Sequence, residues 1–158
     1  MKKILILGIG SRIMMDDAIG IYLVEDLKQL NTDTNITYIL GETDVDYCIE
    51  EALDFDCVII IDAFLSGKQP GEISIVQLKE LNEENEDNLY SMHGAHLLNI
   101  LRCDKHLQDG ILIGIEPYEI NYGFTLSDSL QGCYNSILKE VQGYIDNYVE
   151  QYGGRKNA

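Results

Sequence analysis

The sequence has few basic residues, few prolines and no tryptophan. It holds 11 Lys and Arg against 27 Asp and Glu, which gives a net charge of −16 at pH 7. Binding to nucleic acid or to an anionic membrane surface requires clusters of Lys and Arg, so we expect neither partner. A length of 158 residues, with two prolines and 46% apolar residues, is typical of one globular domain with a full hydrophobic core.

Long apolar runs and paired cysteines are also missing. No apolar run is long enough to cross a membrane. The run at the N-terminus is too short for a secretory leader and ends in Ser11 and Arg12, without a cleavage site. The four cysteines include no C-x-x-C pair, so we expect them to be reduced and structural. These features predict a cytoplasmic protein.

Short aliphatic runs alternate with helical patterns along the chain. The aliphatic runs predict strands at residues 4–7, 36–40, 57–61, 73–78 and 111–115. The spacing of apolar residues predicts helices at 19–30, 47–53, 91–101 and 126–152. We therefore expect a single α/β domain over residues 1–152. It should be a three-layer sandwich, with a mainly parallel, twisted sheet of about five strands and helices on both faces. Residues 153–158 are expected to fray as a C-terminal tail.

Acidic side chains stand where the predicted strands end. A glycine turn after the first strand leads to Asp16 and Asp17, the strand at 57–61 runs into Asp62, and the last strand ends at Glu116. The carboxyl ends of parallel strands form one edge of a sheet, and ligands bind there. Asp16 or Asp17 can also cap the following helix. Asp62 follows an aliphatic run and is desolvated unless it has a partner.

Histidine can complete a metal site at this edge. His93 opens the helix that precedes the last strand; His96 lies on the same helical face and is an alternative, whereas His106 is expected at the surface. Asp17, Asp62 and His93 would form a three-ligand set with open positions, the type of site that binds zinc, nickel or manganese. Each of the three also has a purely structural interpretation, as a helix cap or as a buried polar group.

Motifs of commoner sites are absent from the sequence. The turn after the first strand reads G-I-G-S-R-I, so it lacks the third glycine of the dinucleotide motif G-x-G-x-x-G, and two acids stand where a pyrophosphate would bind. The chain has no G-x-S-x-G elbow, Walker loop or H-E-x-x-H motif. A non-catalytic metal carrier and a nucleotide- or flavin-binding domain are the alternatives to an enzyme.

The motifs of this sequence and their order resemble those of the hydrogenase maturation endopeptidases. The block LILGIGSRIMMDDAIGIYLVEDL is similar to the family pattern G-x-G-N-x-x-x-x-D-[DE]-x-x-G. The blocks IIIDAFLSGKQPGEI, SMHGAHLLNIL and GIEPYEINYGFTLS follow. They are similar to the family's strand-ending aspartate with its P-G loop, its histidine region, and its G-x-x-P and G-L-[ST] region. The resemblance extends from Met1 to about Tyr148.

This resemblance implies an α/β endopeptidase that removes a C-terminal peptide from the large subunit of a [NiFe] hydrogenase after nickel insertion. The implied partner is the hydrogenase large-subunit precursor, and the implied cation is nickel carried by that substrate, although another divalent cation would fit the same ligands. The family's metal-contacting and catalytic residues fall on Asp17, Asp62 and His93. Asp62 or Asp17 is the candidate general base, and Asp16 has a capping or supporting role.

Two segments depart from the family pattern. Ser11 replaces the usual asparagine, and Gly41-Glu42-Thr43 replaces a Gly-Gly-Thr segment that helps to position the substrate. Glu42 adds a side chain where the family keeps its backbone close to the peptide. The residues after His93 also differ from the commoner pattern. These departures predict either an atypical hydrogenase as the client or a weakened activity.

Overall fold

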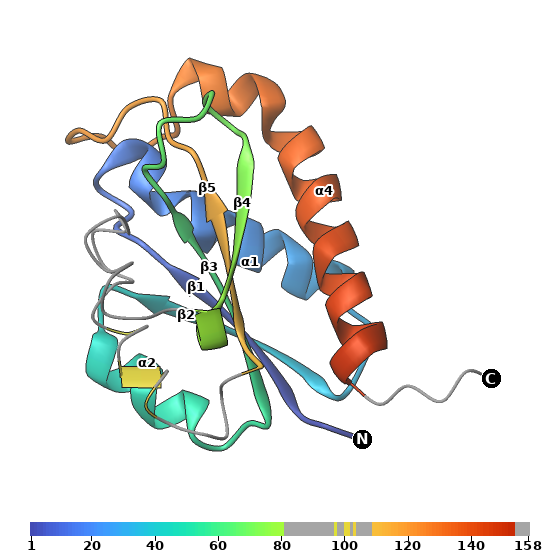
Figure 1. The fold of residues 1–158 in the computed structure, drawn as a ribbon. Coiled ribbons are helices and arrows are strands. Elements are labelled where there is room, and N and C mark those ends of the chain that lie inside the picture. The colour runs from blue at the N-terminus through green and yellow to red at the C-terminus, as the bar shows by residue number, and fades with distance from the viewer. Residues whose placement is uncertain (81–96, 98–99, 102, 104–108, 154–158) are drawn as a thin grey trace.

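One five-stranded sheet organises the protein (Figure 1). The structure is a computed structural model that describes residues 1–80, 97, 100, 101, 103 and 109–153. Its elements are, in order, β1 (Ile4–Ile9), the 3-10 helix η1 (Met15–Ala18), α1 (Ile19–Leu30), β2 (Ile36–Glu42), α2 (Val45–Ala52), β3 (Cys57–Ala63), β4 (Ile73–Gln77), the 3-10 helix η2 (Leu78–Glu80), β5 (Ile111–Ile115) and α4 (Asp128–Tyr152).

The sheet is parallel except at one edge. Its strand order is β2-β1-β3-β5-β4, in which β1 pairs in parallel with β2 and β3, and β5 pairs in parallel with β3. Only β4 is antiparallel to its neighbour. The carboxyl ends of the four parallel strands therefore meet at one edge, where η1 and the segment between β5 and α4 lie (Figure 1). The predicted sheet is confirmed.

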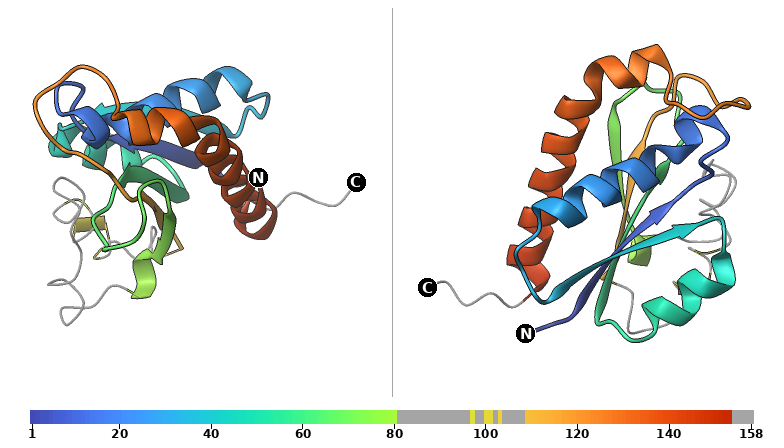
Figure 2. Two further views of the ribbon diagram at one scale, coloured as in Figure 1. Left: turned by 90° about the horizontal axis from the view of Figure 1, so that it is seen from above. Right: turned by 180° about the vertical axis from the view of Figure 1, so that it is seen from behind.

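Helices cover both faces of the sheet. On one face, Ile59 and Ile61 of β3 pack in a cluster with side chains of α1 and α4, which lie along the same side of the sheet (Figure 2). On the other face, Val58 and Ile60 pack with side chains of α2 and with Leu97. Because β3 is covered on both faces, it has apolar side chains at successive positions, each worth about 1.5–3 kcal/mol when fully buried. The sheet is the middle layer of the predicted sandwich.

Two strands continue beyond their aliphatic runs. β1 extends to Ile9, and β3 includes Asp62 and Ala63, where the sequence predicted an end at residue 61. The reason lies in β5, since the ladder of β3 with β5 continues from Ile59 to Ala63. Asp62 is therefore inside a strand and pairs with Gly114, so its backbone is fixed by the sheet on that side.

Other boundaries differ from the prediction by a residue or two. Most of the predicted helix at 91–101 lies outside the described residues. Gly153, where the sequence predicted a frayed tail to begin, is buried and donates from its N–H to Val149 O at 2.8 Å, so it ends α4. In the part of the chain that the structure describes, no helix combines the length and the apolar character needed to cross a bilayer.

Candidate active site

A glycine turn at the end of β1 holds Asp17. Its Oδ2 accepts a hydrogen bond from Ser11 N at 2.9 Å, and the residue is only 2% exposed. Gly10 has φ +141°, and a Cβ at this position would lie 1.9 Å from Asp17 O. Only glycine fits this turn. Because the backbone of Ser11 supplies the hydrogen bond, the replacement of asparagine by serine leaves it in place.

We expect Gly10→Ala to lower the free energy of unfolding by at least about 3 kcal/mol, because the added Cβ must displace the backbone at Asp17. Gly67→Ala is the matched control. Gly67 also has a positive φ of +79°, but no atom lies within 4 Å of its Cβ position. The control should therefore cost only about 1–2 kcal/mol of backbone strain. Urea titrations measure the free energy of unfolding of both variants. Equal decreases in the two variants would contradict the importance of the contact with Asp17.

Asp62 is the second buried acid at this edge. Its Oδ1 accepts a hydrogen bond from Ala63 N at 2.8 Å, and the residue is 1% exposed. Side chains alternate between the two faces of a strand, so Asp62 lies on the α2 face together with Val58 and Ile60. This acid is therefore held in a fixed position by a strand that is buried along its whole length.

The fold brings the segments of Asp17 and Asp62 together. The 3-10 helix that carries Asp17 contacts β3. Shortly after Asp17, Gly20 approaches β3 so closely that a Cβ at Gly20 would lie 2.2 Å from Ile61 O, directly before Asp62. A buried carboxylate is costly unless partners stabilise it, and both acids have such partners. Two buried carboxylates thus stand at the carboxyl ends of adjacent strands.

The predicted histidine ligand lies in a part of the chain that the structure does not describe. His93, His96 and His106 all fall outside the described residues. Leu97, a few positions after His93, is buried on the α2 face, the same face as Asp62. Within the described residues, no group of three or more His, Cys, Asp and Glu side chains could hold a metal ion. The inclusion of His93 in the site stays a prediction.

Asp16 is fully buried and forms hydrogen bonds with a segment that is distant in sequence. Its carboxylate accepts hydrogen bonds from Tyr118 N at 3.0 Å, Glu119 N at 2.9 Å, and both the N and Oγ of Ser127 at 2.7 Å. Neither η1 nor α1 has a side-chain hydrogen bond at its N-cap, so capping of the first helix, one of the roles that the sequence allowed for Asp16 and Asp17, does not occur. Asp16 instead holds the start of α4 beside η1, where Ser127 is the N-cap of α4.

Glu116 holds a second loop at the same edge. It follows β5 and is 5% exposed. Its carboxylate accepts hydrogen bonds from Ser66 N and Oγ at 2.8 and 2.7 Å, and from Gly67 N at 3.2 Å. Both oxygens are thereby engaged by the loop that follows β3. At this edge, Asp16 and Glu116 thus each anchor a loop by hydrogen bonds.

Glu42 has a backbone conformation that favours glycine. Its φ is +51°, which costs a non-glycine residue about 1–2 kcal/mol. Its side chain accepts a hydrogen bond from Arg12 Nε at 3.0 Å, and Arg12 also pairs with Glu25. The hydrogen bonds with Glu25 and Glu42 raise the pKa of the Arg12 guanidinium. Glu42 O accepts from Gly10 N at 3.0 Å, so this departure from the Gly-Gly-Thr pattern lies directly against the turn that holds Asp17.

The fold and its paired acids define an α/β protein with an acidic site at the carboxyl edge of the sheet. A model of the hydrogenase maturation protease family matches residues 21–144. The chain belongs to this family of peptidases, which confirms the resemblance seen in the sequence motifs.

Individual relatives show the same similarity. The hydrogenase expression/formation protein HupD of Bradyrhizobium diazoefficiens is 28% identical over 129 residues, which cover 75% of this chain and 65% of HupD, slightly less than two thirds. HoxM of Azotobacter vinelandii is 27% identical over 149 residues, which cover 90% of this chain and 72% of HoxM. The hydrogenase maturating endopeptidase HybD from Escherichia coli shares the fold, with a TM-score of 0.75 and 24% identity over 92% of this chain and 93% of HybD.

Proposed function

We propose that this protein is an endopeptidase that removes a C-terminal peptide from the large-subunit precursor of a [NiFe] hydrogenase after nickel has been inserted. The observation that carries the proposal is the pair of buried carboxylates, Asp17 and Asp62, at the carboxyl edge of a hydrogenase maturation protease fold. Membership of the family supports the reaction. The two acids support the recognition of a cation that arrives with the substrate.

In this proposal, nickel belongs to the substrate, and Asp17, Asp62 and His93 contact it. Carboxylate oxygens and an imidazole nitrogen are suitable ligands for a borderline divalent cation. The burial of both acids supports this use, since charges interact more strongly where water is excluded. A precursor without nickel offers no cation to these acids, so its scissile bond is not held at the site.

Hydrolysis of the peptide bond requires an activated water and a stabilised oxyanion. We infer that nickel, bound between the substrate's cysteines and the three residues, anchors the scissile bond. Asp62 or Asp17 then accepts a proton from the attacking water, and the leaving amine takes up a proton as the C–N bond breaks. A second possibility is that nickel also polarises the scissile carbonyl or lowers the pKa of its bound water.

Only the nickel-loaded precursor should be shortened. We expect incubation of the protein with loaded precursor to release one C-terminal peptide, detectable as a single mass loss, and unloaded precursor to keep its mass. Equal shortening of both precursors would show that the protein is a protease but does not recognise nickel. Stoichiometric nickel on the purified protein, with no shortening of either precursor, would favour a non-catalytic metal carrier instead.

A further inference from the structure

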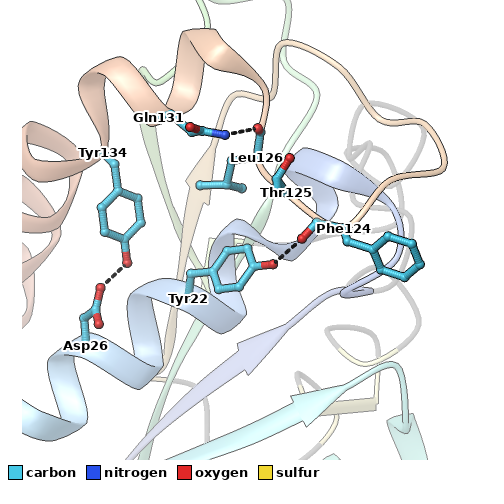
Figure 3. Close-up of a pocket in the computed structure, with 7 residues that line it drawn as sticks. All are labelled: Tyr22, Asp26, Phe124, Thr125, Leu126, Gln131 and Tyr134. Carbon is cyan, nitrogen blue, oxygen red and sulfur yellow. Dashed lines mark hydrogen bonds between the residues drawn. The ribbon is translucent and has the colours of Figure 1, made fainter.

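A groove of about 470 Å³ opens between α1, the start of α4 and the segment that precedes α4 (Figure 3). The rings of Tyr22 and Tyr134 stand on opposite sides of it, and Leu126, which is buried, lies between them. Phe124 is at its rim with the ring pointing outward. Among the described residues that line the groove, Asp26 is the only charged one.

Hydrogen bonds hold the walls of this groove in place. The Tyr134 hydroxyl donates to Asp26 Oδ2 at 2.6 Å, and the Tyr22 hydroxyl donates to Phe124 O at 3.3 Å. Burial, together with the hydrogen bond to Asp26, raises the pKa of the Tyr134 hydroxyl, so it remains a donor. The groove is therefore a fixed, mostly apolar slot with one carboxylate on its wall.

Three exposed aromatic side chains lie on the segment between β5 and α4, which also forms the rim of the groove. Tyr118, Tyr122 and Phe124 are 63%, 69% and 65% exposed, and the rings of Tyr122 and Phe124 pack edge to face with their centroids 5.5 Å apart. Neighbouring exposed apolar groups of this kind mark interaction sites. The segment that carries them is bound to Asp16, which is adjacent to Asp17 in the chain.

We propose that the groove and these three aromatic residues, together the docking surface, bind the hydrogenase large-subunit precursor. The docking surface takes a segment in which an apolar side chain lies next to a Lys or Arg. This inference rests on the proposed function. The slot between Tyr22 and Tyr134 accepts the apolar side chain, and Asp26 attracts the basic one.

Two observations support this choice of occupant. The first is charge. Asp26 lies in a chain of net charge −16, and no Lys or Arg is found among the described residues that line the groove, so a basic segment is complementary to it. The second is continuity. The same segment that forms the groove's rim is fastened by Asp16 beside the carboxylate site, so one bound partner can touch both places.

In this proposal, the docking surface contacts a part of the precursor other than the bond that is cleaved. Contacts made equally in the bound substrate and in the transition state lower KM and leave kcat unchanged. The docking surface should therefore govern capture of the precursor, and substitutions there should separate KM from kcat.

The test compares groove variants with matched surface controls in cleavage of nickel-loaded precursor. Phe124→Ser and Asp26→Asn should each raise KM about tenfold and leave kcat within about twofold, as expected for truncation of an interface anchor. Leu53→Ser, directly after α2 on the opposite face of the sheet and 55% exposed, is the control for Phe124. Glu150→Gln, an exposed acid near the C-terminal end of α4, is the control for Asp26. Both controls should keep the wild-type KM.

Binding is measured separately, with immobilised nickel-loaded precursor at several salt concentrations. Asp26→Asn should weaken the salt dependence of binding, whereas Phe124→Ser should not. Groove variants that retain the wild-type KM and affinity would overturn the proposal. A wild-type dimer that Phe124→Ser dissociates would assign the groove to a second copy of the chain and would also overturn it. Groove-dependent binding without any cleavage would refute the proposed function alone, and no binding at all would refute both.

Discussion

Replacing Asp62 by asparagine is expected to lower the rate of precursor cleavage by at least about 10³-fold, because the amide removes both a cation ligand and a candidate general base. The fold should survive the change. Asparagine has the same shape, and its side-chain oxygen can accept the hydrogen bond from Ala63 N that Asp62 accepts at 2.8 Å. Mass spectrometry of the nickel-loaded precursor over time measures the rate.

The control for this experiment is Asp54→Asn, the same exchange at an exposed acid between α2 and β3. It should cleave at the wild-type rate, and thermal unfolding of both variants should remain cooperative. Undiminished cleavage by Asp62→Asn would refute the role that we assign to Asp62. Loss of cleavage in both variants would point to an effect of the acidic surface in general.

Replacing Asp16 by alanine is expected to lower the free energy of unfolding by about 3–5 kcal/mol. The substitution removes the acceptor for the backbone N–H groups of Tyr118, Glu119 and Ser127, and a buried donor without a partner costs about 1–3 kcal/mol. It also removes the acceptor for the hydroxyl of Ser127, the N-cap residue of α4. Urea-induced unfolding measures the change.

Asp128→Ala provides the comparison for Asp16→Ala. Asp128 is also close to the start of α4, but it is exposed, so its loss should cost no more than about 1 kcal/mol of helix-dipole stabilisation. A loss below about 1 kcal/mol for Asp16→Ala would mean that water replaces the carboxylate, and that the segment before α4 is held by other contacts.

The hydrogen bonds of Asp16 and Glu116 support the geometry that the proposed reaction requires. Asp16 fixes the segment before α4, and Glu116 fixes the loop after β3, so buried carboxylates hold two loops at the edge that carries Asp17 and Asp62. A site that recognises one cation by its coordination geometry requires such support. Ligands that change position cannot distinguish one geometry from another. The acids of this edge thus divide into two that we assign to the substrate and two that hold the loops.

Much of the fold could be predicted because its signals are local. The aliphatic runs of β1, β3 and β5 indicate burial on both faces of the sheet. The glycine turn before Asp17 indicates the end of the first strand. The end of β3 was predicted too early, since it depends on the ladder with β5 and not on the residues of β3 itself.

By itself, the sequence determined the family, the succession of strands along the chain and the presence of acids at their ends, because apolar periodicity and motif spacing are properties of neighbouring residues. Only the tertiary structure decided which groups the acids meet. Asp16 meets partners 102 to 111 positions further along the chain, and Asp26 meets the Tyr134 hydroxyl 108 positions further along. A hydrogen bond depends on where two segments come together in space, and that is settled by the packing of α1 and α4 on one sheet.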